Sequence, residues 1–176
     1  MSKKPYYGLI GNGETAALVG ADLAVAWLCV PRFDRVPVVA GALDPIQGGH
    51  LWLGLTDDAG ERLPLAPVEQ TYVGRTALLR TAVTGDGWRV ETTDFMPWGI
   101  SVLIREIRVV KERPDASPVR LAWGLEPVRS AAFPIEVRAV NGVVIARAPG
   151  GAVAVTGPEQ IRIDGAYTAR QVLGYG

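Results

Sequence analysis

The chain has 176 residues, a formal net charge of zero, 48% hydrophobic residues and 20% charged residues, as an ordinary soluble globular protein does. Without a basic excess it has little to hold a phosphate backbone, so general nucleic-acid binding is not expected. No apolar run approaches the roughly 18 residues of a membrane helix, and Met1 to Gly8 is too short and polar for a signal peptide. We therefore expect a cytoplasmic, single-domain protein over residues 1–176, without a membrane partner.

Short apolar segments punctuated by 21 glycines and 13 prolines predict an all-β chain. Turn signals recur every 8–12 residues or so, a spacing typical of sandwiches and barrels, and we expect an antiparallel β-sandwich. No long segment shows convincing helical periodicity, and residues 62–70 and 111–118 read as loops. In chain order, strands are expected near residues 6–11, 15–20, 24–30, 36–43, 50–55, 70–74, 76–83, 88–95, 100–110, 118–128, 134–140, 143–148, 152–156, 160–164 and 166–173.

Two glycine-containing turns predict hairpins. Asn141-Gly142 separates two β-like runs, and both residue types tolerate a positive φ. Gly85-Asp86-Gly87 links two alternating segments in the same way.

The stretch Gly11 to Ala16 matches the dinucleotide-binding pattern G-x-G-x-x-A, with Asp34 roughly 20 residues further on. That pattern requires a crossover helix between parallel strands, whereas the chain that follows reads as strand, turn, strand. The glycines therefore favour a tight turn in which they supply a positive φ.

The segment Pro31 to Asp34 follows the apolar run AVAWLCV, which Pro31 ends because it lacks an amide donor. We expect Arg32 and Asp34 to pair across the turn while Phe33 anchors it. The alternative is a loop that faces a sugar or a partner domain, since planar hydrogen-bonding groups and an aromatic ring suit both.

Asp94 closes another strand, ahead of Trp98 in the same turn. We expect Asp94 to accept hydrogen bonds from local backbone amides, as short acidic residues in turns do. A general acid would need a second carboxylate within roughly 5–10 Å. Asp34 is the one we nominate, and nothing in the sequence places the two together.

The five tryptophans raise the possibility of sugar stacking. Trp27 and Trp123 lie on apolar strand faces and are expected in the core. Trp52 lies opposite a leucine face and Trp98 lies in a turn, so these two are the better candidates for exposure, at an interface or as sugar platforms.

Cys29 is the only cysteine, which excludes an intrachain disulfide. Its apolar surroundings are typical of a small buried hydrophobe. His50 is the only histidine, so a zinc site is not expected, and we expect no cofactor.

The stretch Tyr7 to Asp34, YGLIGNGETAALVGADLAVAWLCVPRFD, resembles the opening of bacterial and archaeal glucoamylase- and trehalase-like enzymes of glycoside hydrolase family 15. The run AGALD ending at Asp44, the later GGHLWL, and TTDFMP at Thr92 to Pro97 fit the same family. The resemblance implies a supersandwich-like β-sandwich that precedes an (α/α)6 barrel. It also implies that both catalytic glutamates lie in the barrel, so no residue here inherits a catalytic role.

The chain departs from the family at one turn in particular. Where the family has Asp-Gly-Ser-Ile-Asp before a tryptophan, this chain has Asp22 to Ala26, DLAVA, so an acidic, glycine-containing turn has become apolar. Glu14 replaces an arginine, and Arg35 to Pro37 replaces a Ser-Pro.

These observations favour a stand-alone, non-catalytic structural or interaction module, not itself an enzyme, which forms a homo-oligomer or binds a separately encoded catalytic barrel. One alternative is the non-catalytic subunit of a split α-glucosidase or trehalase. Another is a carbohydrate-binding module for an α-glucan or a disaccharide. The residues expected to face a ligand or partner are Arg32, Phe33, Asp34, Trp52, Asp94 and Trp98.

Overall fold

The computed structural model describes residues 6–129, 136–141, 143–148, 151–157, 161–163 and 167–174, and in this part of the chain it holds strands and no helix. The first sheet contains β1 (Tyr7–Gly11), β2 (Ala16–Gly20), β3 (Val25–Cys29), β4 (His50–Thr56), β9 (Val119–Glu126) and β13 (Ile161–Ile163). The second contains β5 (Ala66–Tyr72), β6 (Leu79–Gly85), β7 (Trp88–Phe95), β8 (Val102–Lys111), β10 (Glu136–Val140), β11 (Val143–Ala148), β12 (Gly151–Thr156) and β14 (Tyr167–Gly174).

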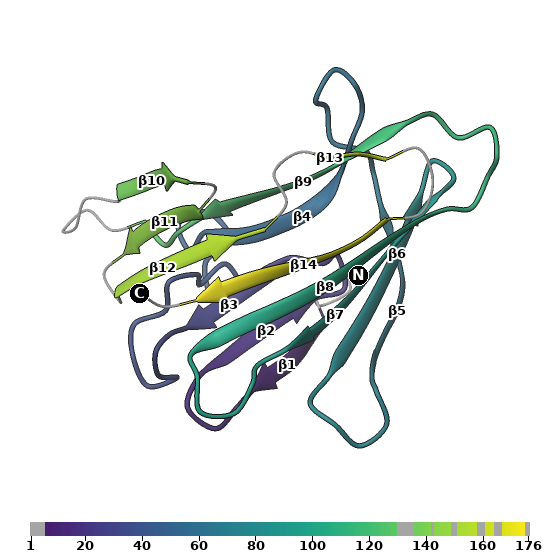
Figure 1. The fold of residues 1–176 in the computed structure, drawn as a ribbon. Helices are drawn as coiled ribbons and strands as arrows, with labels where there is room; N and C mark the ends of the chain where they lie inside the picture. The colour runs from purple at the N-terminus through teal and green to yellow at the C-terminus, as the bar shows by residue number, and fades with distance from the viewer. Residues whose placement is uncertain are drawn as a thin grey trace.

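The sheets are antiparallel and pack face to face, which confirms the expected all-β sandwich (Figure 1). Strand order is β1–β2–β3–β4–β9–β13 in the six-stranded sheet and β10–β11–β12–β14–β8–β7–β6–β5 in the eight-stranded sheet. Among the described residues, none forms a helix able to span a bilayer.

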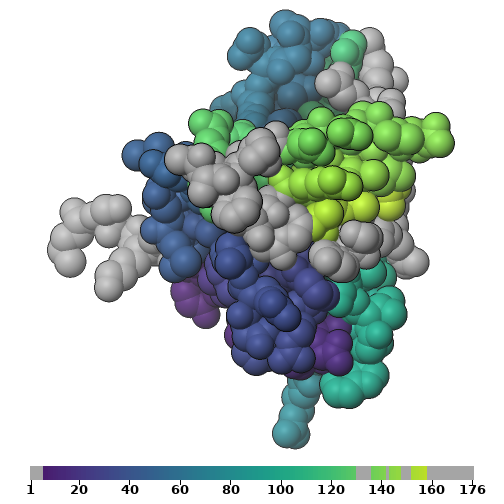
Figure 2. Space-filling model, turned by 90° about the vertical axis from the view of Figure 1, so that its left-hand side faces the viewer, coloured from purple at the N-terminus to yellow at the C-terminus, as the bar shows by residue number. Residues whose placement is uncertain are grey.

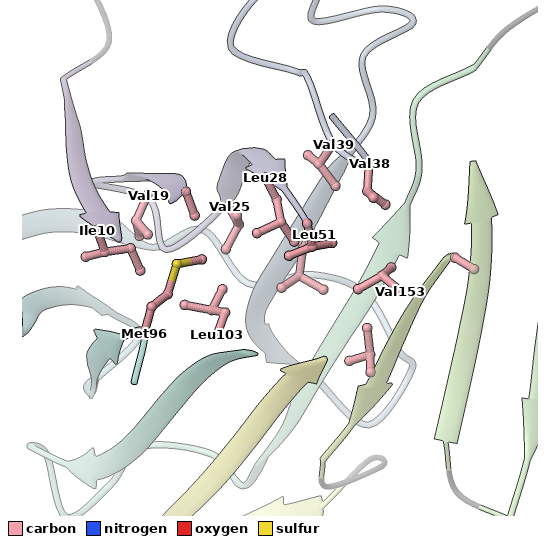
Figure 3. Packing of buried hydrophobic residues seen from close by; sticks show 14 of the residues in the cluster. Ile10, Val19, Val25, Leu28, Val38, Val39, Leu51, Met96, Leu103 and Val153 are labelled. Atoms are coloured by element: carbon pink, nitrogen blue, oxygen red, sulfur yellow. The ribbon is translucent and has the colours of Figure 1, made fainter. Parts of the chain in front are cut away.

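Alternation along each strand builds the core between the sheets. In β7, buried and half-buried residues alternate without a break, because successive side chains of a strand point to opposite faces. Two clusters of buried side chains result, one around Leu28, Leu51 and Leu103 (Figure 3) and one around Trp88. Trp123 packs against both clusters, so the core is continuous.

The tryptophans follow the expectation in part, since Trp123 packs against the core and Trp98 is exposed. Trp88, not singled out by sequence, is fully buried, and its indole N–H donates to the Ser117 carbonyl at 2.9 Å. Trp27 and Trp123 are half-buried. An indole that is buried needs a hydrogen-bond partner, and the connection after β8 supplies it.

Both hairpin predictions are confirmed. Asp86 (φ 51°) and Gly87 (φ 80°) form the two-residue turn between β6 and β7. Asn141, at φ 51°, lies in the turn between β10 and β11. Positive φ at these positions is what a tight hairpin turn requires.

One strand expectation is wrong, and one loop expectation is wrong in part. Residues 36–43 form no strand, only an isolated bridge between Leu28 and Val39, and the chain then turns around Asp44, whose carboxylate accepts the amides of Ile46 and Gln47. Val38, Val39 and Ala40 are buried although they lie in a loop, whereas Val36 and Leu43 are exposed. The expected loop at 62–70 contains the start of β5, which is largely exposed and therefore lacks the apolar alternation that marks a strand.

Side chains of β5 close the gap to the first sheet. The Tyr72 hydroxyl accepts the Leu9 amide at 3.0 Å and donates to the Leu9 carbonyl at 2.7 Å. The Gln70 amide nitrogen donates to the Val19 carbonyl at 3.1 Å. Tyr72 thus satisfies the amide and the carbonyl of Leu9 in β1, an edge strand of the six-stranded sheet.

Candidate interaction site

Three turns that carry sequence motifs meet at one end of the sandwich. They are residues 12–15 between β1 and β2, residues 30–35 after β3, and residues 96–101 between β7 and β8. Hydrogen bonds cross between all three, and we call this region the three-loop end. Figure 2 shows this side of the molecule, with the 31–48 connection in indigo.

Asn12 holds two of the turns together. Its side-chain nitrogen donates to the carbonyls of Pro97 (2.8 Å) and Ile100 (2.9 Å). Its side-chain oxygen accepts the amides of Glu14 (3.0 Å) and Thr15 (2.9 Å). The side chain is only 7% exposed, so these bonds are shielded from water and fix the turn geometry.

Further bonds attach the third turn. The Phe33 amide donates to the Glu14 carbonyl at 2.7 Å, and the Ser101 hydroxyl donates to the Pro31 carbonyl at 3.2 Å. The backbone of residues 30–35 is therefore tied to both neighbours. Phe33 itself is 54% exposed, so its amide and not its ring anchors the turn, contrary to the expectation.

The three-loop end exposes apolar side chains. Trp98 is 87% exposed and Ile100 is 51% exposed. Together with Phe33, they place exposed apolar side chains on the turns at residues 30–35 and 96–101. Gly13 has φ 89°, and a Cβ added there would lie 3.6 Å from the Trp98 ring, so the indole borders the first turn. An exposed large aromatic on turns fixed by buried hydrogen bonds is typical of an interaction surface.

Arg32 and Asp34 form the predicted pair. Arg32 Nε lies 3.0 Å from Asp34 Oδ1 and Arg32 Nη2 lies 3.2 Å from Asp34 Oδ2, and both side chains are about half exposed. This hydrogen bonding lowers the pKa of the Asp34 carboxyl and raises the pKa of the Arg32 guanidinium. Asp34 therefore stays ionised at neutral pH and is unsuited to donate a proton.

Cys29 lies beneath the same turn and is fully buried. Its thiol donates to the Arg35 carbonyl at 3.3 Å. Burial, assisted by the charge of Asp34, raises the pKa of the thiol to about 11. The residue is thus a packing group with a neutral thiol, as the sequence indicated.

Asp94 does not face solvent. It is fully buried and pairs with the fully buried Arg105, whose Nε lies 2.6 Å from Asp94 Oδ1. The Thr92 hydroxyl adds a bond at 3.2 Å. The expectation of local backbone amides is wrong, because Asp94 lies within β7 on its core face, where a cross-strand arginine neutralises it.

Trp52 lies apart from the three-loop end, on the outer face of the six-stranded sheet. Its indole lies over Gly124, its cross-strand neighbour, and the Arg62 guanidinium stacks 3.5 Å from the ring centroid. It borders a shallow pocket of about 210 Å³ that also includes Asp22, His50 and Leu65. With Arg62 on the indole, a sugar ring would have to displace the guanidinium before stacking there.

The predicted site residues therefore fall in three places. Arg32, Phe33, Asp34 and Trp98 come together, whereas Asp94 is in the core and Trp52 is on a sheet face. Asp34 and Asp94 serve separate arginines and do not form a carboxylate pair. In the described residues, no group of three or more His, Cys, Asp or Glu side chains is placed to hold a metal.

Sequence reasoning missed the contribution of Asn12 and Ile100. An asparagine between two glycines signals a turn, which was found. Its partners are 85 and 88 residues away in sequence, however, and no local pattern carries that information.

The fold and site define an antiparallel β-sandwich domain whose motif-bearing turns form one exposed apolar end. The chain belongs to the trehalase-like N-terminal family, whose model matches residues 5–157. This match confirms the trehalase-like resemblance seen in the sequence.

Two similar proteins are both described as trehalases. That of Thermoplasma volcanium is 33% identical over 96 residues, which cover 54% of this chain and 15% of the relative. That of Mycolicibacterium smegmatis is 30% identical over 136 residues, which cover 69% of this chain and 20% of the relative. The chain thus spans a fifth or less of the length of these curated relatives.

Proposed function

We propose that this chain is a non-catalytic interaction module of a trehalase-like glycosidase, and that its three-loop end binds the catalytic domain. The observation that carries the proposal is Trp98, an indole 87% exposed on a turn that Asn12 fixes by buried hydrogen bonds. Exposed aromatic side chains on a preorganised surface lose little conformational entropy on binding, which favours a protein interface.

Two further observations support a catalytic partner. Trehalases similar to this chain are at least five times longer than the part it matches, so in those proteins a large region adjoins the sandwich. The carboxylates that the sequence nominated, Asp34 and Asp94, are each paired with an arginine, so neither is suited to act as a general acid.

Binding of an α-glucan or disaccharide is the second candidate, and Trp98 is again the residue that favours it. Its indole is open enough to stack on a sugar ring, whereas that of Trp52 is covered by Arg62. A protein partner accounts better for Phe33 and Ile100, which extend the apolar surface beyond the area of one sugar ring.

A tagged pull-down from native lysate tests the proposal, with the eluate assayed for trehalose and α-glucoside hydrolysis. Three baits are compared: the unchanged chain, Trp98→Ala, and the control Val68→Ala, which removes a half-exposed apolar group from β5. We expect hydrolysis and a barrel-sized protein with the unchanged chain and with Val68→Ala, and loss of both with Trp98→Ala. Equal recovery by all three baits, or no hydrolase with any, would contradict the proposal.

Calorimetry with trehalose and maltose separates the second candidate. Heat at millimolar sugar that disappears in Trp98→Ala would replace protein docking by carbohydrate binding as the function of this end.

A further inference from the structure

The strand β10 is an edge strand of the eight-stranded sheet and is exposed over its whole length. All five of its residues are exposed, including Val137 and Val140, each at 52%. Among the described strands it pairs with β11. Figure 1 shows β10 at the end of the sheet, past β11 and β12. An edge strand of this kind presents outward-pointing N–H and C=O groups that can form hydrogen bonds with another strand.

Two other edge strands, β1 and β5, differ from β10. In β1, Tyr72 occupies the amide and carbonyl of Leu9. In β5, Pro67 lacks an amide and a bulge follows it, and both features hinder strand addition. The sequence of β10, EVRAV, contains no proline, and its register with β11 is regular from Glu136 to Val140.

The side chains of β10 specify how a second copy would fit. Val137 lies across from the fully buried Ala146 and so shares the core face of the sheet, whereas Glu136 and Arg138 lie on the outer face. In an antiparallel pairing centred on Val137, Glu136 of each copy lies opposite Arg138 of the other. A pairing centred on Arg138 would instead put two guanidinium groups face to face. Opposite charges directly across strands stabilise a pairing and like charges oppose it.

From this arrangement, we propose that two copies of this chain pair through β10, antiparallel and centred on Val137, to continue the sheet across a two-fold axis. Glu136 already lies near two exposed arginines, at 3.4 Å from Arg138 and 3.8 Å from Arg147, so its carboxylate is held on the outer face. Pairing adds Arg138 of the second copy and covers the exposed Val137.

This dimer does not depend on the proposed function, because β10 is not part of the three-loop end. A pairing centred on Val137 brings only Glu136, Val137 and Arg138 of each β10 opposite one another and buries little surface, so the dimer is weak and its fraction rises with concentration. Trp98→Ala should leave it unchanged, which keeps the two proposals separable.

Charge reversal tests the register. Sedimentation velocity over a concentration series compares the unchanged chain with Glu136→Arg, Arg138→Glu and the double variant. Each single reversal places like charges opposite each other twice, and we expect a monomer at all concentrations. The double variant exchanges the two charges and should restore the dimer. A monomeric unchanged chain, or a dimer indifferent to the single reversals, would overturn the proposal.

Cross-linking locates the contact. Val137→Cys places the two new thiols directly opposite each other, and oxidation should give a disulfide-linked dimer. Val140→Cys is the matched control, since Val140 is equally exposed, yet its two copies lie about 20 Å apart along the paired strands, too far for a disulfide. The native Cys29 is buried and does not compete. Equal cross-linking at both positions would contradict the register.

Discussion

Arg105 in β8 binds Asp94 in β7 through two nitrogens, at 2.6 and 3.2 Å, with both side chains fully buried. A further nitrogen, Nη1, donates to the Leu23 carbonyl at 2.8 Å, in the turn that connects β2 and β3 of the opposite sheet. One guanidinium thus satisfies a buried carboxylate and joins the two layers of the sandwich.

Removing either partner should destabilise the fold strongly. Asp94→Ala leaves an unpaired buried guanidinium, and we expect the free energy of unfolding to fall by about 3–5 kcal/mol in urea denaturation. The double variant Asp94→Leu with Arg105→Met should lose less than the sum of the single changes, because no charge is left alone. Asp34→Ala, from the exposed pair, is the control and should change stability little. A small effect of Asp94→Ala would show that water reaches the pair.

At position 23, glycine should be at least as stabilising as alanine, which reverses the usual order of stability. Leu23 has φ 70°, a left-handed backbone conformation that favours glycine, and it is fully buried. Truncating a buried leucine costs about 2–5 kcal/mol, and the left-handed backbone costs a non-glycine residue about 1–2 kcal/mol. We therefore expect the unchanged chain to be most stable, and Leu23→Gly to be at least as stable as Leu23→Ala. Thermal denaturation of the three proteins checks this; a more stable alanine variant would argue against the left-handed turn.

Two glycines on the outer face of the six-stranded sheet should respond oppositely to alanine. A methyl group at Gly124 would collide with the Trp52 indole, which Arg62 holds in place. A methyl group at Gly54 would meet no atom within 4 Å. We expect Gly124→Ala to lower the free energy of unfolding by about 1–3 kcal/mol, as overpacking does, and Gly54→Ala to be neutral or stabilising. Equal effects at the two positions would mean that the Trp52 ring moves freely.

Stability should fall in alkaline solution because of Cys29. Its pKa rises from 9.0 to about 11 on folding, so the folded state retains the thiol proton where the unfolded state releases it. The resulting stabilisation is complete below pH 9 and is lost as the pH rises to 11. We expect the stability of the unchanged chain relative to Cys29→Ala to decrease across this range in urea titrations. A constant difference would mean that the thiol is not desolvated.

Local patterns predicted the sandwich well where strands have one buried face. The segments at 50–55 and 88–95 alternate, and the Asp86-Gly87 turn signals its hairpin within four residues. Only the end of β5 is predicted, by the strand expected near 70–74, because the start of β5 is exposed and contains Pro67. The strand expected at 36–43 is absent, because apolar content alone does not distinguish a loop with buried residues from a strand.

The site was predicted only in part, for a different reason. The Arg32–Asp34 pair joins residues two positions apart, so a local reading found it. The Asn12 bridges and the Arg105–Asp94 pair depend on which turns and strands become neighbours. One signal was present: Arg105 shares its strand face with Leu103 and Ile107, and Asp94 shares its face with Trp88 and Val90. Two charges at core positions of adjacent strands indicate a buried pair.

The Tyr72 hydroxyl has a consequence for how the protein behaves at high concentration. A protein with two unprotected edge strands can pair with another copy at each of them and so polymerise. Here a copy that arrives at β1 meets Leu9 with its amide and carbonyl already bonded to Tyr72, and must break both bonds before it can pair. One phenol group at the surface therefore hinders strand addition at β1, one of the edges through which copies could stack into fibres.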